Sequence, residues 1–395
     1  MHPAAHPMNR TSWIPYSAGM ARNLVWILTF SLFANLGWAA LPVKKKRRAV
    51  AAHAAHRVRT RSQNARLGVV RGGPWTEPTF ADSTQGDNID GEDLEIRRAA
   101  VEALGPYNGS VVVVDPATGR ILSAVNQRLA LGAGFQPCST VKVSVALAAL
   151  SEKVIDSQTN FRLRGMRMDL TYAMAHSNNY FFATLGQRMG FERVSYYAHQ
   201  FGYGEKAGLN IPGEQPGHYP ETPPRNGGVG MLTSFGEDIA QTPLQFAALL
   251  SALANGGTLY YLQYPRTPRE IDLFIPRVKR QLDIGKLISA IKPGMRAAVE
   301  FGTAHRARQE APIAGKTGTC SEDHTHLGWF GSFNDVRGRK LVVVVLLTGG
   351  RPAIGALAAG IAGDIYRQLE QANYFAASGP LTPALLVPDP NRLTR

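Results

Sequence analysis

Runs rich in β-forming residues lie towards both ends of this chain, and helical patterns fill the interval between them. The segment "SVVVVDPATGRILSAVN" at 110–126 holds two such runs joined by an Asp-Pro-x-x-Gly turn, which predicts a β-hairpin. Further strands are predicted late in the chain, at "APIAGKTGT" 311–319, "LGWFGSF" 327–333 and "KLVVVVLLTGG" 340–350. This order predicts an α+β fold in which both ends of one domain complete an antiparallel sheet.

Helical patterns account for most of the residues around these strands. An amphipathic helix is predicted at 94–105, before the hairpin, and another at about 353–372, after the last strand. The helix at 241–257 has the clearest ends, because Thr242 is suited to the N-cap and Gly256 to the C-cap. Further helices are predicted at 139–152, 168–190, 193–201 and about 282–302.

The net charge of +14 comes from one end of the chain. Residues 1–66 contain eleven Lys or Arg and no Asp or Glu, so the rest of the chain carries 32 basic residues (43 − 11) against 29 acidic ones. A nearly neutral body argues against nucleic-acid binding, which needs a basic surface. Apolar residues make up 44% of the chain and charged residues 18%, a composition typical of a globular protein with a hydrophobic core.

The amino-terminal segment has the pattern of a targeting element. Leu24–Leu41 form an apolar run after Arg22, and Gly37 and Ala39 provide a small-x-small cleavage site. The run is long for a signal-peptide core and short for a membrane span, so a cleaved signal and a retained anchor both stay open. The basic cluster "KKKRR" at 44–48 conflicts with export of the residues after it, because such clusters tend to stay in the cytoplasm.

These patterns divide the chain into four segments. Residues 1–43 are predicted to be a signal peptide or membrane anchor, and 44–92 a basic flexible linker without apolar periodicity. Residues 93–376 hold the predicted strands and the helices between them, and form the folded domain. Residues 377–395 are a Pro-rich tail.

Ser139 and Lys142 form an S-x-x-K motif at the start of a predicted helix. At this spacing the lysine lies one turn further along the same helix face as the serine. A neutral lysine can take the proton from a serine hydroxyl, and burial next to a second cation lowers a lysine pKa enough to make it neutral. The motif alone does not exclude a capping serine with a solvated lysine, because Ser289 and Lys292 have the same spacing.

Two other motifs occur later in the chain, in a fixed order. Ser177-Asn178-Asn179 is an S-x-N motif and Lys316-Thr317-Gly318 is a K-T-G motif on a predicted strand. S-x-N also occurs at 62–64 and 332–334, but only Ser139, Ser177 and Lys316 give the order S-x-x-K, S-x-N, K-T-G, with gaps of 38 and 139 residues. This triple is the known pattern of β-lactamases and penicillin-binding proteins.

Over about 93–376 the chain resembles the transpeptidase domain of penicillin-binding proteins. Beyond the triple, similar segments are "DPATGRILSAV", "LNIPGEQPG", "TPLQFAALLSALANGGTL", "FGTAHRARQEAPIAGKTGT" and "GWFGSF". The resemblance implies a β-lactamase/transpeptidase-like fold, with a five-stranded antiparallel sheet flanked by helices and a separate all-helical lobe. The gap of 38 residues between the first two motifs is shorter than is usual in the family, so we expect a trimmed helical lobe.

The resemblance implies a role for each polar residue of the first two motifs. Ser139 would attack the carbonyl of a D-Ala-D-Ala stem peptide, with Lys142 as its base. Ser177 would relay the proton to the departing amine. Asn179 would orient Lys142 and the substrate amide.

The K-T-G strand would bind the substrate. Lys316, with Thr317 and Thr319, would hold the terminal carboxylate, with Gly318 between them, and would help to keep the catalytic lysine neutral. The resemblance also implies an oxyanion hole made by the backbone N–H groups of Ser139 and Thr319.

The resemblance implies partners as well as roles. The substrates would be peptidoglycan stem peptides, β-lactam antibiotics would acylate the same serine, and neither a cofactor nor a metal is implied. The domain would act in the bacterial cell envelope, on the periplasmic side, secreted or anchored to the cytoplasmic membrane by its amino-terminal segment. The sequence identifies no protein partner.

The only two cysteines flank the predicted site, since Cys138 precedes Ser139 and Cys320 follows Thr319. In the family that the chain resembles, the helix start and the K-T-G strand face each other, which implies a Cys138–Cys320 disulfide. A similar bond is found at matching positions in carbapenem-hydrolysing serine β-lactamases. The alternative is two free buried thiols, which an oxidising compartment disfavours.

A transpeptidase or carboxypeptidase is favoured over a β-lactamase. The corresponding β-lactamases use a glutamate in a Glu-x-x-x-Asn loop to position water, and the candidates Glu205…Asn210 and Glu221…Asn226 are each one residue too long. The cysteine pair favours the β-lactamase alternative. A non-catalytic β-lactam sensor is a further alternative.

A metal site is the main alternative of another class. His324 and His326, beside Glu322 and Asp323, could chelate a metal ion, but a polar turn after the K-T-G strand explains them as well. His176, next to Ser177, is predicted to support the site or to lie on the surface rather than to act in catalysis.

Overall fold

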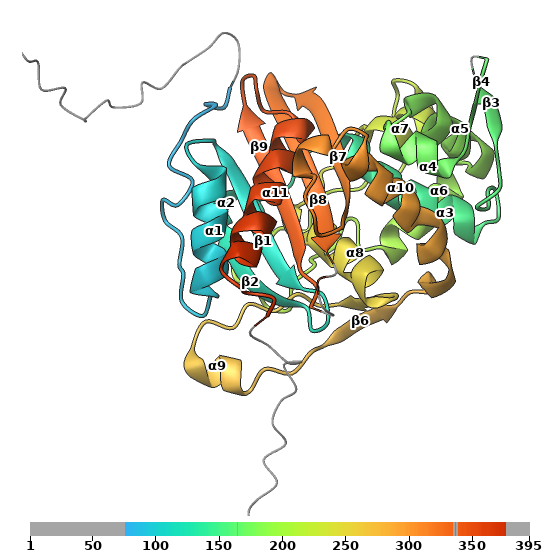
Figure 1. Cartoon of the computed structure of the whole chain (residues 1–395). Helices are drawn as coiled ribbons and strands as arrows, with labels where there is room; N and C mark the ends of the chain where they lie inside the picture. The colour runs from blue at the N-terminus through green and yellow to red at the C-terminus, as the bar shows by residue number, and fades with distance from the viewer. Residues whose placement is uncertain (1–75, 164, 335, 337–338, 377–395) are drawn as a thin grey trace, which may run out of the picture. The chain divides into compact units, whose positions relative to one another are not determined.

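The computed structural model describes residues 76–376, except 164, 335 and 337–338 (Figure 1). Its centre is a five-stranded sheet in the order β2-β1-β9-β8-β7, in which every neighbouring pair is antiparallel. The strands are β1 (Gly109–Asp115), β2 (Arg120–Val125), β7 (Ile313–Glu322), β8 (Thr325–Asn334) and β9 (Val342–Gly349). The first hairpin and the late strands therefore form one sheet, and the prediction of an α+β fold with an antiparallel sheet is confirmed.

The valine-rich runs become the buried middle of the sheet. Val111 of β1 pairs with Val345 of β9, and both side chains are fully buried. Such runs are apolar at every position because helices cover both faces of the sheet, so that neither face meets water. β7, which carries the K-T-G motif, lies at the edge of the sheet.

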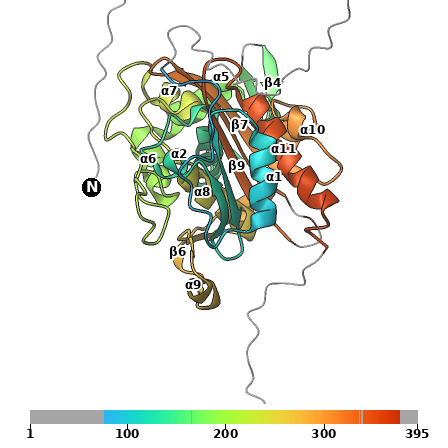
Figure 2. The same cartoon turned by 90° about the vertical axis from the view of Figure 1, so that its left-hand side faces the viewer.

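One face of the sheet is covered by the first and last helices, α1 (Leu94–Leu104) and α11 (Gly355–Gln371). Their apolar sides pack with alternate residues of β1 and β9 into one cluster of buried side chains, which includes Ile96, Val113 and Ile365. Figures 1 and 2 show the two helices next to each other on this side, with α8 on the other.

The other face packs against α8 (Pro243–Asn255) and the helical lobe. Thr242 caps α8 by accepting from Gln245 N, and Gly256 ends it in the left-handed conformation, as predicted. The remaining helices are α2 (Gln127–Leu131), α3 (Lys142–Ser151), α4 (Leu170–Ala175), α5 (Asn179–Met189), α6 (Phe191–Gln200), α7 (Gly228–Phe235), α9 (Pro268–Asp272) and α10 (Ile288–Glu300). Short two-stranded sheets are formed by β3 (Phe161–Leu163) with β4 (Met166–Met168) and by β5 (Thr258–Tyr260) with β6 (Val278–Gln281).

One predicted helix is two helices in the structure. The segment 168–190 is interrupted between α4 and α5, because Ser177 has a φ of 54°, which no helix residue can adopt. Asn178 then caps α5, its side chain accepting from Phe181 N. The break places the S-x-N motif on a turn instead of inside a helix.

Residues 76–92 belong to the folded body, although the sequence pattern placed them in the flexible linker. The carboxylate of Asp87 lies 2.7 Å from the Arg97 guanidinium of α1, and Glu92 is buried and accepts from Ala124 N at 3.1 Å. Phe80 forms a β-bridge with Tyr107. Polar contacts hold this segment to α1 and β2. Such contacts leave no periodic pattern of apolar residues in the sequence, so the segment could not be recognised as part of the folded domain.

The predicted targeting segment, the linker up to residue 75 and the Pro-rich tail lie outside the described residues. In the part of the chain that the structure does describe, every helix is too short or too polar to cross a membrane.

Candidate active site

Two turns and one strand bring the three motifs together. The turn Cys138–Val141, which is a 3-10 helix, carries Ser139 and continues into α3. The turn between α4 and α5 carries Ser177, and β7 carries Lys316. The S-x-x-K, S-x-N and K-T-G residues therefore come from three separate parts of the fold and meet at one place.

The Ser139 turn packs closely against β7. A Cβ atom on Gly318 would lie 2.8 Å from Pro137 O, so a glycine is needed for the strand to come this near. Cys138 has a φ of 53°, a left-handed conformation that costs energy for a residue with a side chain. This backbone leaves Ser139 partly exposed, just before the N-terminus of α3.

Lys142 is surrounded by the oxygen atoms of the other motif residues. Its side chain is fully buried (0% exposed), and Nζ lies 2.9 Å from Ser139 Oγ. The same Nζ is 3.0 Å from Ser177 Oγ, 2.8 Å from Ser177 O and 2.5 Å from Asn179 Oδ1. These oxygens are all neutral, so none of them supplies the negative charge that would pair with a buried ammonium group.

The two lysines have depressed pKa values. Burial holds the pKa of Lys142 well below its ordinary value, and the positive charge of Lys316 lowers it further. Burial alone lowers the pKa of Lys316 to about 7. A neutral Lys142 has a lone pair that can accept the proton of the Ser139 hydroxyl.

Ser177 lies between the two lysines. Its Oγ is 3.0 Å from Lys142 Nζ and 2.9 Å from Lys316 Nζ, which also donates to Thr317 O at 2.9 Å. The left-handed φ of Ser177 turns this residue out of the helix pattern and into the site. A hydroxyl in this position can pass a proton between a buried amine and a bound group.

The threonines of the K-T-G strand differ in exposure. Thr319 is exposed, and its Oγ1 accepts from Gly355 N at 2.8 Å, at the start of α11. Thr317 is buried, and its Oγ1 is 2.7 Å from Thr303 Oγ1. No motif marks Thr303 in the sequence; its only signal was its place in the segment "FGTAHRARQEAPIAGKTGT".

The predicted disulfide is present. Cys138 and Cys320 are bonded with a Cα–Cα distance of 5.6 Å, and the bond spans 182 residues of sequence. It joins the residue before Ser139 to the residue after Thr319. The two backbone N–H groups expected to form an oxyanion hole are thus each one residue from the same covalent link.

Two hydrogen bonds hold Gln136, just before the turn that carries Ser139, to the β7–β8 hairpin. Trp329 Nε1 donates to Gln136 O at 3.0 Å, and Gln136 N donates to Glu322 Oε2 at 2.8 Å. Burial raises the pKa of Glu322, and the nearby acidic groups Asp323 and Glu237 add to this effect. The β7–β8 hairpin thus helps to position the turn that carries Ser139.

The second copies of the motifs have ordinary structural surroundings. Ser289 donates to Lys286 O at 3.2 Å, and Lys292 Nζ lies 6.0 Å from the centre of the Phe333 ring. Ser332 Oγ is 3.2 Å from the Tyr366 hydroxyl. The S-x-N copy at 62–64 lies outside the described residues.

The glutamates considered for a β-lactamase lie in other surroundings. Glu205 forms ion pairs with Lys279, at 3.1 Å, and with Arg280. Glu221 is exposed. We therefore assign neither glutamate a role in positioning water.

Two residues of the possible metal site, His326 and Glu322, have polar partners of their own. His326 Nδ1 is 2.7 Å from Ser321 Oγ, and Glu322 accepts from Gln136 N. Among the described residues, no group of three or more His, Cys, Asp or Glu side chains is placed to hold a metal ion. His176 is exposed, and its ring centre lies 4.4 Å from that of Tyr172 and 5.9 Å from that of Phe301.

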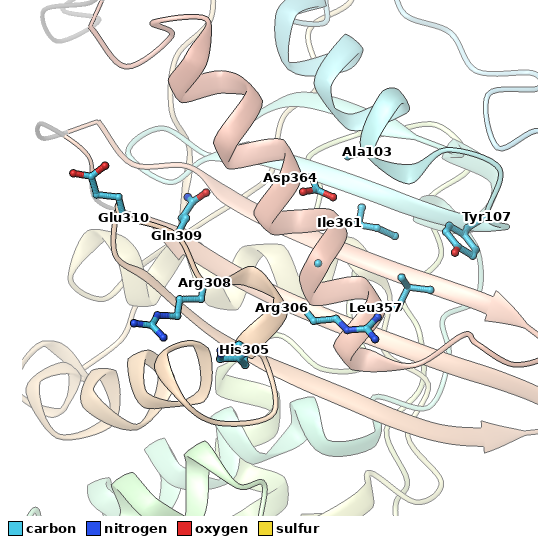
Figure 3. A pocket seen from close by; sticks show the side chains of 11 residues that line it. Ala103, Tyr107, His305, Arg306, Arg308, Gln309, Glu310, Leu357, Ile361 and Asp364 are labelled. Carbon is cyan, nitrogen blue, oxygen red and sulfur yellow. The ribbon is translucent and has the colours of Figure 1, made fainter.

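Figure 3 shows the lining of a cavity of about 930 Å³. The loop between α10 and β7 lines one side of it, with Arg306 and Gln309, and α11 lines another, with Leu357, Ile361 and Asp364. Its lining includes no residue of the three motifs. We therefore place the candidate site where the motif residues Ser139, Lys142, Ser177 and Lys316 contact one another, and not at this cavity.

The antiparallel sheet, its two helical layers and the serine–lysine cluster at the edge strand define a protein of the β-lactamase/transpeptidase fold class. The family model described as penicillin binding protein transpeptidase domain matches residues 109–367, so the chain belongs to this family. The match spans the sheet, the helical lobe and all three motifs.

Curated relatives and solved structures agree with this assignment. The chain is 29% identical over 310 residues to stage V sporulation protein D of Bacillus subtilis (67% of this chain, 48% of that protein). It is 25% identical over 359 residues to the peptidoglycan D,D-transpeptidase MrdA of Escherichia coli K12 (67% of this chain, 55% of that protein). The chain thus spans about half the length of these relatives.

The fold is similar to that of Pseudomonas aeruginosa PBP2, solved in complex with WCK 5153. The TM-score is 0.60 at 23% identity, and the match covers 72% of this chain and 77% of that one. The β-lactamase/transpeptidase-like fold expected from the sequence is confirmed.

Proposed function

We propose that the domain is a peptidoglycan D,D-transpeptidase, which transfers the acyl part of a D-Ala-D-Ala stem peptide through an ester on Ser139. The observation that carries the proposal is the 2.9 Å distance between Ser139 Oγ and the buried Lys142 Nζ. The name of the relative MrdA, a peptidoglycan D,D-transpeptidase, supports the same activity.

Acylation begins with a proton transfer inside this pair. Neutral Lys142 accepts the Ser139 proton while Oγ attacks the carbonyl carbon of the penultimate D-Ala. The backbone N–H groups of Ser139 and Thr319 stabilise the oxyanion. Ser139 and Thr319 are each next in the chain to one cysteine of the Cys138–Cys320 bond, which supports this pairing.

The departing D-Ala needs a proton on its nitrogen. Ser177 Oγ, 3.0 Å from Lys142 Nζ, relays the proton that the lysine has taken. Asn179, 2.5 Å from the same Nζ, orients the lysine and the substrate amide. The C–N bond then breaks, and the acyl group stays on Ser139 as an ester.

Lys316, Thr317 and Thr319 bind the terminal carboxylate of the donor, with Gly318 allowing the close packing behind them. A lysine whose pKa is about 7 gains its proton easily when a carboxylate arrives. The same residues would bind the carboxylate of a β-lactam, so that these antibiotics acylate Ser139.

The proposed transpeptidase activity also implies an acceptor and a location in the cell. The acceptor is an amine of a second stem peptide, or water if the enzyme is a carboxypeptidase. The domain acts on the periplasmic side of the cell envelope, and residues 1–43 act as a signal peptide or membrane anchor. The linker up to 75 and the tail from 377 flank the catalytic domain.

A serine β-lactamase is the second candidate, because the Cys138–Cys320 bond matches one found in carbapenem-hydrolysing enzymes. Incubation with a fluorescent penicillin separates the two. We expect one stable adduct per protein, located on Ser139 by mass spectrometry and absent from Ser139→Ala. Turnover of many equivalents supports the β-lactamase instead, and a protein that neither forms an adduct nor hydrolyses the penicillin contradicts both candidates.

A further inference from the structure

Three aromatic rings form an exposed strip beside the S-x-N turn. His176 lies between Tyr172 and Phe301, with ring centres 4.4 Å and 5.9 Å away. Tyr172 is 42% exposed and Phe301 58%, and His176 is exposed as well. We call these three side chains the aromatic strip. Aromatic rings left in water next to a catalytic site are a favourable surface for an apolar ligand group.

The strip comes from two helices that pack side by side. Tyr172 lies in α4 and His176 is its C-cap, four residues further on, so the two rings lie on the same side of the helix. Phe301 directly follows α10, which packs against α4 (Figure 1). The ring positions are therefore set by packed helices and not by a free loop.

Three contacts join the strip to the active-site strand. Gly302 follows Phe301, and a Cβ on it would lie 2.2 Å from Ala175 O, so the loop touches the end of α4. Thr303 N donates to the same Ala175 O at 3.1 Å. Thr303 Oγ1 is 2.7 Å from Thr317 Oγ1 on β7. The strip is thus held at a fixed place relative to the K-T-G residues.

The strip adjoins the turn that carries the proposed proton relay to the leaving amine. Ser177, the proposed proton relay to that amine, is the next residue after His176. Aminolysis of the acyl-enzyme is the reverse of acylation with a different amine, so the acceptor enters where the leaving amine left. An acceptor whose nitrogen approaches Ser177 brings the rest of its structure towards the strip.

From this arrangement we infer that Tyr172, His176 and Phe301 form the acceptor subsite, which binds the apolar part of an incoming amine and favours aminolysis over hydrolysis. The inference rests on the proposed transpeptidase function. The amine nitrogen forms a C–N bond to the ester carbonyl carbon, and the C–Oγ bond to Ser139 breaks. The amine proton passes through Ser177 and Lys142 to the Ser139 oxygen, so that no further reactant is needed.

The test measures how the acyl-enzyme divides between two acceptors. An N-acyl-D-alanyl thioester acylates Ser139, and mass spectrometry quantifies the amide and the free acid formed with D-Phe or with glycine. The amide-to-acid ratio is taken within each variant, so it does not depend on the acylation rate or on the fraction of active protein.

We expect Phe301→Ala, and also Tyr172→Ala, to lower the ratio for D-Phe about fivefold, as expected for one lost aromatic contact, and to leave that for glycine unchanged. Tyr196→Ala is the matched control, because Tyr196 is 59% exposed on α6 and packs against Tyr197 outside the strip. An unchanged D-Phe ratio in both strip variants, or an equal fall for D-Phe and glycine, overturns the inference. A wild-type protein that forms no acyl-enzyme overturns the proposed function along with it.

Discussion

Lys142 Nζ lies 2.9 Å from Ser139 Oγ, although the lysine is fully buried and the serine is not. The hydroxyl, amide and carbonyl oxygens around this Nζ satisfy a neutral amine, whereas a charged amine would need a carboxylate to offset its burial. The same burial that disfavours the ammonium makes the amine a base for the hydroxyl beside it. Stability and reactivity at this position are therefore coupled.

Replacing Lys142 by Met should stop acylation without unfolding the protein. The variant keeps a side chain of similar volume and removes the base, so we expect the rate of penicillin acylation to fall about 100-fold or more. The melting temperature should not fall, because a buried amine is replaced by an apolar group.

Stopped-flow fluorescence with a labelled penicillin measures the rate. Lys292→Met is the matched control, since Lys292 belongs to the second S-x-x-K pattern and its Nζ lies over the Phe333 ring instead of beside Ser139. An acylation rate in Lys142→Met equal to that of the wild type would exclude the lysine as the base.

A methyl group on Gly318 should displace the turn Cys138–Val141, which carries Ser139. The added Cβ would lie 2.8 Å from Pro137 O and 3.2 Å from Thr140 Cγ2, so the turn that carries Ser139 must shift. We expect Gly318→Ala to slow acylation about tenfold or more, because reacting groups are sensitive to displacements of about 1 Å.

Gly360→Ala provides the comparison for this substitution. Gly360 lies in α11, and its new Cβ would be 3.6 Å from Arg306 Cβ, an ordinary contact. This variant should gain about 0.5–1 kcal/mol in the free energy of unfolding and acylate at the wild-type rate. Equal acylation by the two variants would show that the approach of β7 to the turn is not critical.

Breaking the Cys138–Cys320 bond should destabilise the domain. The bond closes a long loop, with 182 residues of separation, and loss of such a crosslink costs about 2–5 kcal/mol. Thermal unfolding with and without dithiothreitol measures this, and the double variant Cys138→Ser, Cys320→Ser should not respond to the reductant. An unchanged melting temperature in protein whose thiols titrate as reduced would contradict the expected role.

The sheet could be predicted because its signals are local. The valine-rich runs of β1 and β9 are apolar at every position, and the ends of α8 carry their own capping residues. The break at Ser177 could not be predicted from the sequence. Its left-handed φ goes with its contacts to Lys142 and Lys316, which are distant in sequence, and no local propensity signals it. The segment around Asp87 was missed for a similar reason, since its partner Arg97 lies in the next helix.

The three motifs identified the candidate site residues, but not the residues behind them. Thr303 and Gln136 are both hydrogen-bonded to β7, and neither has a pattern that marks it in the sequence. Phe301 follows a helix end, where an aromatic residue carries no specific signal. Such residues become visible only when segments far apart in the sequence are placed together.

The pKa of Lys316 predicts how stability depends on pH. In the folded protein this pKa is about 7, against an ordinary value of 10.5, so between these values the unfolded chain holds a proton that the folded protein does not. Stability therefore rises as the pH is raised through this window, by up to about 1.4 kcal/mol per pH unit from this group. The pKa of Lys142 is shifted in the same direction and adds to the rise.

Lys316→Met should make this pH dependence shallower, because it removes one of the two groups that cause it. Urea unfolding at pH 7.5, 8.0 and 8.5 measures the free energy of unfolding for the wild type and the variant, in a range that stays below the ordinary tyrosine pKa of about 10. Lys286→Met, at an exposed position, should keep the wild-type slope. Equal slopes for Lys316→Met and the wild type would mean that Lys316 is protonated in the folded protein across this range, and the K-T-G lysine would then carry its charge before a carboxylate binds.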